Sequence, residues 1–354
     1  MGLPEIFISF ETAALSAIKR SSRGVVALAI SDTTAGGATL ATYRSLAEVV
    51  STQFTAENYR MLQLCFMAGP SKVIVLRVGE DEEENAGAAE QAAYNALSAL
   101  SFDYLAAPGL TQASVISYVK SERAAGRGIK LVTANATAPD HEGIINFCAS
   151  DLVLTDGAIT AANYCARIAG LLAATPLTRS ATYAKLAEVV SCTLSDDPDE
   201  DIDDGKLILV ADGEGFCLGR AVNSLTTLTV DHGAPFQKIK IVDGIDLIRT
   251  DIARTFRESY IGKVLNDYDN KLLLVTAINA YFKALMGDVL DKTAENVCFV
   301  SLDGQRTWLE SHGTDTSDMS DAEILRANTG SEVFLEATLT FCDAMEDLSL
   351  KIAM

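Results

Sequence analysis

The residues best suited to chemistry form an acidic run at 196–204. Three of its aspartates alternate like the first ligands of an EF-hand calcium loop: Asp199, Asp201 and Asp203. That loop also needs a glycine at its sharp turn and a glutamate at its end. The chain has Asp204 and Val210 at these positions. The sequence therefore predicts a solvated loop and no metal site here.

Other catalytic signals are incomplete. The chain contains three histidines: His141, His232 and His312. Neither a G-x-S-x-G nucleophile motif nor an H-E-x-x-H zinc motif accompanies them. No Lys-Ser/Thr follows Gly36-Gly37 to complete a phosphate loop, and the spacing of Gly213 and Gly215 is typical of a hairpin turn. We expect no catalytic residue and no cofactor.

Seven cysteines are scattered along the chain: Cys65, Cys148, Cys165, Cys192, Cys217, Cys298 and Cys342. Their number is odd, none forms a C-x-x-C pair, and most lie in apolar segments. This pattern indicates reduced, buried side chains rather than disulfides or a zinc site.

The composition limits the possible partners. A chain of 354 residues can form two domains, or one large domain with an insertion. Its net charge of -20 argues against nucleic acid and against anionic membrane surfaces as partners. The mean hydropathy is nevertheless +0.19, which fits either a well-filled core or further burial against copies of the chain. We find no signal peptide and no membrane span, and expect synthesis in the bacterial cytoplasm.

The elements that would position any site alternate along the first half. Apolar runs predict strands at 25–30, 73–76, 102–106, 129–133 and 151–154. Helical patterns fall between them at 56–68, 86–99, 112–124 and 157–173. This order predicts a mixed α/β fold with a largely parallel sheet.

The second half changes character. Asp212-Gly213 joins 207–211 to 216–218 and predicts a hairpin. An apolar stripe from Ile248 to Tyr260 predicts a helix, and a second helix follows at 267–286. We further expect a strand at 297–302, a short helix at 320–327 and an alternating segment at 333–341.

Both chain ends also alternate like strands. The apolar positions are Ile6, Ile8 and Phe10 at the start, and Leu348, Leu350 and Ile352 at the end. Each strand can pair within its own domain, which is the common case. Alternatively, each can add to a sheet in a neighbouring subunit.

Four stretches resemble the tail sheath proteins of contractile phages and R-type bacteriocins, in particular the short sheaths of Gram-positive prophages and clostridial bacteriocins. They are ARIAGLLAATPLTRS at 166–180, GKLILV at 205–210 with RAVNSLTT at 220–227, FRESYIGKV at 256–264 leading to INAYF at 278–282, and FCDAMEDLSL at 341–350. Two positions depart from the family pattern, Ala174 and Ala221, and both are small-for-small changes.

The resemblance implies a structural subunit and not an enzyme. Such subunits polymerise as a helical assembly of stacked rings around an inner tail tube protein, and baseplate and tail terminator proteins close the ends. On contraction the sheath drives the tube through a target envelope, while terminal arms exchange strands between neighbours. The particle, a virion tail or a bacteriocin, is released by lysis.

The resemblance also implies an inner α/β domain built from both parts of the chain, with a middle domain inserted as an outer layer. We expect an N-terminal arm at 1–20, inner domain at 21–95 and 241–342, outer domain at 96–240, and a C-terminal arm at 343–354.

In this family the C-terminal domain lines the tube, which draws attention to a slightly basic region at 249–271. Its cations are Arg249, Arg254, Arg257, Lys263 and Lys271. Weak charged contacts would suit a sheath that must release its tube on contraction. The alternative is that these charges form local helix pairs, worth roughly 0.2–0.5 kcal/mol each.

Two other functions remain open at this point. An α/β nucleotide- or substrate-binding enzyme would need a phosphate loop or a titratable cluster, and the sequence shows neither. A tail tube or baseplate subunit belongs to the same structural class, and electron microscopy would distinguish it from a sheath.

Overall fold

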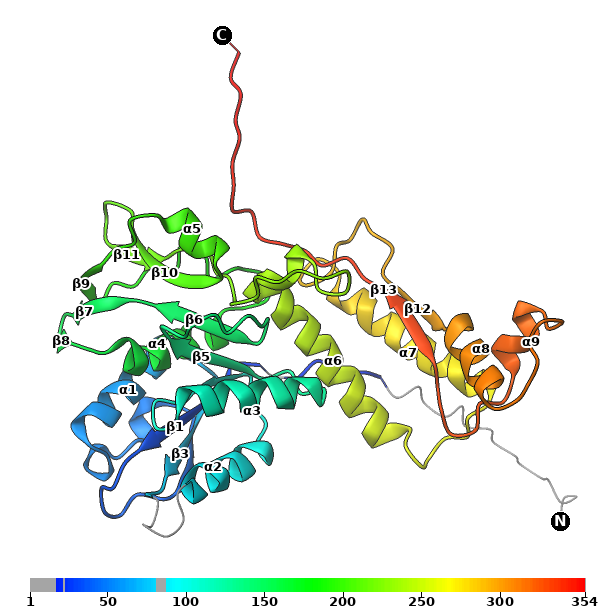
Figure 1. Ribbon diagram of the computed structural model, residues 1–354, viewed down its shortest axis with the longest axis horizontal. Coiled ribbons are helices and arrows are strands. Elements are labelled where there is room, and N and C mark those ends of the chain that lie inside the picture. Colours follow the sequence, from blue (N-terminus) through cyan, green and yellow to red (C-terminus); the bar gives the residue numbers. More distant parts are fainter. Residues whose placement is uncertain (1–16, 22, 81–86, 354) are drawn as a thin grey trace, which may run out of the picture. The chain divides into compact units, whose positions relative to one another are not determined.

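The computed structural model describes residues 17–21, 23–80 and 87–353, and it divides the chain into two compact units (Figure 1). Unit 1 comprises residues 1–20 and 251–342, and unit 2 comprises residues 21–250 and 343–354. Ile6, Ile8 and Phe10 lie outside the described residues.

Unit 2 is built on an eight-stranded sheet with the order β11-β10-β6-β5-β4-β1-β3-β2. Its strands are β1 (Val25–Ser31), β2 (Leu40–Tyr43), β3 (Lys72–Val78), β4 (Tyr104–Ala106), β5 (Lys130–Ala134), β6 (Ile144–Cys148), β10 (Lys206–Ala211) and β11 (Phe216–Leu218). The six central strands pair in parallel, and the edge strands β2 and β11 run antiparallel to their neighbours. The mixed α/β prediction is confirmed.

Helices cover both faces of this sheet, which explains the continuous apolar runs of its strands. The helices are α1 (Ala56–Phe66), α2 (Ala88–Ser98), α3 (Gln112–Ala124) and α4 (Ala161–Ala174). Leu62 of α1 and Ile168 of α4 pack on the face that carries Leu28. Leu97 of α2 and Val119 of α3 pack on the opposite face, against Ala27 and Ala29.

α1 and α4 approach each other closely at Gly170. A Cβ atom at this position would lie 2.1 Å from the carbonyl oxygen of Cys65, so only glycine fits. This part of the stretch at 166–180 is therefore a helix-packing surface.

Unit 2 also contains a smaller sheet and several short helices. A three-stranded antiparallel sheet has the order β8-β7-β9, with β7 (Ser150–Leu154), β8 (Gly157–Ala158) and β9 (Val189–Thr193). Three short 3-10 helices lie at Leu46–Glu48, Ser51–Gln53 and Ala234–Gln237. The acidic run, expected as a loop, forms the helix α5 (Pro198–Asp203), because Asp197 accepts a hydrogen bond from the backbone N–H of Glu200 as its N-cap.

α6 (Ile239–Ser259) begins in unit 2 and ends in unit 1. Unit 1 continues with α7 (Tyr268–Leu285), β12 (Val297–Val300), α8 (Leu302–Ser311), α9 (Asp321–Arg326) and β13 (Leu335–Thr338). β12 and β13 form an antiparallel two-stranded sheet. A capping box between Ser320 and Glu323 starts α9, near the position expected for a short helix.

The boundary expected at residue 95 runs through the large sheet. β1 and β4 pair in parallel, with Val26 beside Tyr104, so residues on the two sides of that boundary share one core. The second division lies after Thr250 rather than at 240, because the first half of α6 packs into unit 2.

Candidate functional site

The C-terminal segment leaves its apolar side chains uncovered. Residues 343–353 form no regular helix or strand and run as an extended chain (Figure 1). Leu348, Leu350 and Ile352 are 89%, 72% and 74% exposed. Three exposed apolar side chains at alternating positions are typical of a strand that lacks its partner sheet.

The start of this segment is held firmly by unit 2. The side chain of Glu346 is only 7% exposed and accepts a hydrogen bond of 2.7 Å from the Thr182 hydroxyl. Its other oxygen lies 3.5 Å from both Arg220 and Lys238. We call these four residues the arm root.

Neighbouring carboxylates complete the arm root. Asp347 accepts a hydrogen bond of 2.6 Å from Arg220 and raises the pKa of that guanidinium. Burial acts to lower the pKa of Lys238, but its bonds to Asp343 and Glu346 raise it overall. Both side chains therefore stay cationic around neutral pH, and the arm becomes free only after residue 347.

At the other end, the described chain begins in unit 1. The carbonyl of Lys19 accepts a hydrogen bond of 2.5 Å from Arg254, and Arg20 lies 3.3 Å from Asp288. These contacts hold residues 19 and 20 to unit 1.

The small sheet of unit 1 offers an open edge at β13. Its backbone pairs Cys298 with Ala337, and Ser301 donates a hydrogen bond of 3.0 Å to the carbonyl of Phe334. Because hydrogen-bonded pairs alternate in an antiparallel ladder, Leu335 and Ala337 direct their N–H and C=O groups away from β12. No described residue pairs with β13 on that side. Such an edge accepts an added strand.

The basic residues expected to contact a tube do not form one group. Arg249 is exposed in unit 2, and Arg257 and Lys263 are exposed in unit 1. Arg254 is half-buried and lies 3.1 Å from the buried Asp251. Arg254 therefore has a side-chain ion partner, and Lys263 donates a hydrogen bond to the backbone carbonyl of Glu258.

Lys271 is buried instead of exposed. Its ammonium donates hydrogen bonds to Gln305 at 2.5 Å and to Thr329 at 3.1 Å, inside unit 1. Burial lowers its pKa. Lys271 could contact a tube only by breaking these hydrogen bonds. The prediction that Lys271 contacts the tube is therefore wrong.

Sequence analysis missed a buried ionic network in unit 2. Asp246, which is 4% exposed, lies 2.9 Å from both Arg123 and Lys130. Asp243 lies 2.7 Å from Arg23 and 3.0 Å from Lys130. Burial acts to raise the pKa of both aspartates, but the neighbouring cations lower it overall. A signal was present, because Arg123 continues the buried stripe of Val115 and Val119 at helical spacing.

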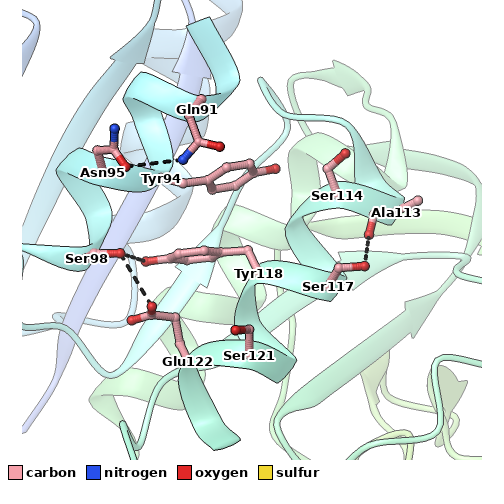
Figure 2. A pocket seen from close by; sticks show the side chains of 10 residues that line it. All are labelled: Gln91, Tyr94, Asn95, Ser98, Ala113, Ser114, Ser117, Tyr118, Ser121 and Glu122. Carbon is pink, nitrogen blue, oxygen red and sulfur yellow. Dashed lines mark hydrogen bonds between the residues drawn. The ribbon is translucent and has the colours of Figure 1, made fainter. Parts of the chain in front are cut away.

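A surface groove of about 670 Å³ lies between α2 and α3 (Figure 2). Tyr94 and Tyr118 stack across it with ring centroids 4.7 Å apart. Burial raises the pKa of Tyr94 to about 12. Its ten lining residues include neither histidine nor cysteine, and Glu122 is paired with Arg127. The groove is lined by four serines, but no histidine among its lining residues can activate one of them as a nucleophile.

The remaining candidates have structural partners. Nδ1 of His141 accepts a hydrogen bond from the N–H of Gly143, and burial lowers the pKa of this histidine. His312 stacks on Trp308. Gly213 and Gly215 lie in the β10–β11 hairpin turn, as predicted. Asp201 bonds to Ser195 and Lys206, and the described residues contain no cluster able to hold a metal ion.

Comparisons with known proteins agree along the whole chain. Residues 84–224 match the family model for the phage tail sheath protein central domain, and residues 231–290 match the phage tail sheath C-terminal domain. A tail sheath protein of Clostridium phage phiCD119 is 36% identical over 370 aligned positions, covering 100% of this chain and 99% of that protein.

Solved structures show the same fold. The contracted helical sheath of the anti-feeding prophage superposes with a TM-score of 0.72 at 14% identity, covering 100% of this chain and 99% of that one. A sheath tail protein from Listeria innocua gives a TM-score of 0.68 at 17% identity, over 93% of this chain and 98% of that one. Among the described residues, no helix is long and apolar enough to cross a bilayer.

Proposed function

The chain belongs to the phage tail sheath protein family, and from that premise we propose that it polymerises as stacked rings around an inner tube and contracts to drive the tube through a target envelope. It is a structural sheath subunit. We infer that it acts by binding other proteins rather than by transforming a substrate.

One observation carries the proposal: the C-terminal arm is fixed at its root and uncovered beyond it. Burial of each Leu or Ile side chain contributes about 1.5–3 kcal/mol, which the arm does not gain within its own subunit. Pairing with a sheet in a neighbour would bury these side chains and satisfy the backbone groups of the arm. The open edge of β13 is a suitable acceptor.

The N-terminal arm would make a second connection of the same kind. Its alternating Ile6, Ile8 and Phe10 fit strand addition. Two arms leaving from different units would link each subunit to more than one neighbour. Such links would keep the lattice connected while the subunits rotate during contraction.

For the tube contact we propose Arg249, Arg254, Arg257 and Lys263, with Arg257 and Lys263 as the principal residues because they are exposed and lie in unit 1. Exposed charge pairs set register and are weakened by salt, so they suit a contact that must be released. The tube surface facing them would be acidic.

The other partners follow from the same function. Baseplate and terminator proteins would bind the two ends of the sheath. The subunit would be made in the bacterial cytoplasm and released in a virion or bacteriocin particle by lysis. No cofactor is needed, because contraction uses energy stored in the extended lattice.

The test is polymerisation of the purified chain, followed by sedimentation and electron microscopy. We expect the chain to form hollow cylinders alone, and a variant lacking residues 348–354 to remain a folded monomer with an unchanged thermal transition. Lys351→Ala is the matched control, because it changes the same segment but keeps the apolar side chains Leu348, Leu350 and Ile352. If the truncated chain still forms cylinders, the arm does not carry assembly.

A further inference from the structure

The side chain of Asn279 on α7 takes the place of a neighbouring strand. Its Nδ2 donates a hydrogen bond of 2.9 Å to the carbonyl of Cys298, and its Oδ1 accepts one of 2.7 Å from the N–H of Cys298. A carboxamide carries the same donor and acceptor as a peptide group. Asn279 therefore makes the two bonds that a residue on an added strand would make.

These bonds lie on the outer edge of β12. In this ladder Ser301 bonds to Phe334, so the odd-numbered residues of β12 face β13 and the even-numbered ones face away. Cys298 is even-numbered, and its backbone groups meet Asn279 instead of a strand. The two-stranded sheet thus has one edge closed by a side chain and one open edge at β13.

We propose that Asn279 is a positioning residue of assembly: by occupying the outer edge of β12, it makes β13 the single edge of this sheet to which a strand from a second copy adds. The inference rests on the proposed function, because it specifies where the arm of a neighbour binds. One-sided addition fixes the order of strands across a subunit contact, and an error in that order would misplace the next subunit.

Cysteine cross-linking can locate the added strand. Cys148, Cys192 and Cys342 are first changed to serine to remove the partly exposed thiols. Each arm residue from Leu348 to Ile352 is then changed to cysteine in turn, together with either Ala337→Cys on β13 or Phe299→Cys on β12. Arm residues of both parities are needed because Ala337 and Phe299 lie on opposite faces of the sheet. Adjacent strands lie about 4.8 Å apart and a disulfide needs Cα atoms within about 7 Å, so only the adjacent strand can be linked.

With Asn279 in place, we expect intermolecular disulfides to Ala337→Cys and none to Phe299→Cys. In Asn279→Leu, which keeps the volume but loses both hydrogen bonds, we expect links to Phe299→Cys to rise about tenfold and ordered cylinders to give way to irregular aggregates. Ala280→Leu is the control, since Ala280 is exposed on the same helix. Its cross-links should match those of the unchanged chain.

The outcomes separate the two proposals. If Asn279→Leu is folded and still links only to Ala337→Cys, Asn279 has a purely structural role and the inference is overturned, while arm exchange stands. If the unchanged chain forms cylinders but links to neither strand, the arm binds elsewhere and the inference is overturned, while polymerisation as a sheath stands. Should Asn279→Leu not fold, Asn279→Asp retains the acceptor for the Cys298 N–H and must show a partial shift toward Phe299→Cys.

Discussion

Glu346→Gln should weaken polymerisation without weakening the fold. The substitution keeps the shape of the side chain and its acceptor for the Thr182 hydroxyl, but it removes the charge that faces Arg220 and Lys238 at 3.5 Å. Hydrogen bonds to charged groups contribute about 1.5–3 kcal/mol, and we expect the lower value because one neutral bond is retained. In this variant the arm root becomes ordered only when a neighbour binds. The conformational entropy lost on ordering then reduces the free energy of assembly.

A loss of about 1.5 kcal/mol corresponds to a rise of about tenfold in the critical concentration for cylinder formation. Sedimentation of a dilution series measures this concentration directly. The thermal transition should stay within a few degrees of that of the unchanged chain, because the arm contributes little to either core.

Asp347→Asn is the matched control. It makes the same change in net charge one residue away, at a side chain that is 79% exposed. Exposed ion pairs contribute little, so we expect less than a fivefold change. Equal critical concentrations for Glu346→Gln and Asp347→Asn would refute the role assigned to the arm root.

Three further results are expected. Asp246→Asn should lower the free energy of unfolding by about 3 kcal/mol in urea denaturation, the lower end for a broken buried ion pair, because Arg123 and Lys130 lose this carboxylate but keep Glu142 and Asp243. A loss under about 1 kcal/mol would contradict this. Since the folded-state pKa of Asp246 is lowered, its contribution is present above the ordinary carboxyl pKa of about 4 and is lost as the pH falls below it, so the variant should lose less stability than the unchanged chain between about pH 5 and 3. Arg257→Glu with Lys263→Glu should abolish tube-templated extended sheath in low salt yet allow cylinders without tube; normal yields on the tube would argue against this contact. Calorimetry should detect no stoichiometric micromolar calcium binding at 196–204, and such binding, if abolished by Asp199→Ala, would restore the EF-hand interpretation.

Sequence patterns predicted the strands that are buried on both faces. The apolar runs of β1 and β3 and the turn of the β10–β11 hairpin appear where expected. β6 was missed because Asn146 interrupts its apolar run. In the structure, this side chain bonds to both the N–H and the C=O of Ala136, at 2.7 and 2.8 Å, so a polar residue is satisfied inside a central strand.

The candidate site was predictable only in part. Lys271 was selected for its charge, although it lies three, seven and ten positions before Leu274, Ile278 and Tyr281 on the buried side of α7. Helical spacing, taken alone, would have placed it inside. The alternation of apolar and polar residues at 348–352 predicted a strand-like arm. It did not show whether the arm pairs within its own subunit or with a neighbouring one. The arm root joins Glu346 to residues far away in the sequence, and no local pattern reports such a contact.

The arm root also determines how the molecule would carry mechanical load. The N–H of Cys342 bonds to the carbonyl of Val289 in unit 1, and four residues later Glu346 is fixed in unit 2. A pull on the free arm therefore reaches the arm root before it reaches unit 1. A strand pulled along its own axis loads all its hydrogen bonds at once, whereas one peeled from its end breaks them singly. A fixed root favours the first geometry, so an exchanged arm of this chain would act as a tensile connector during a rapid stroke.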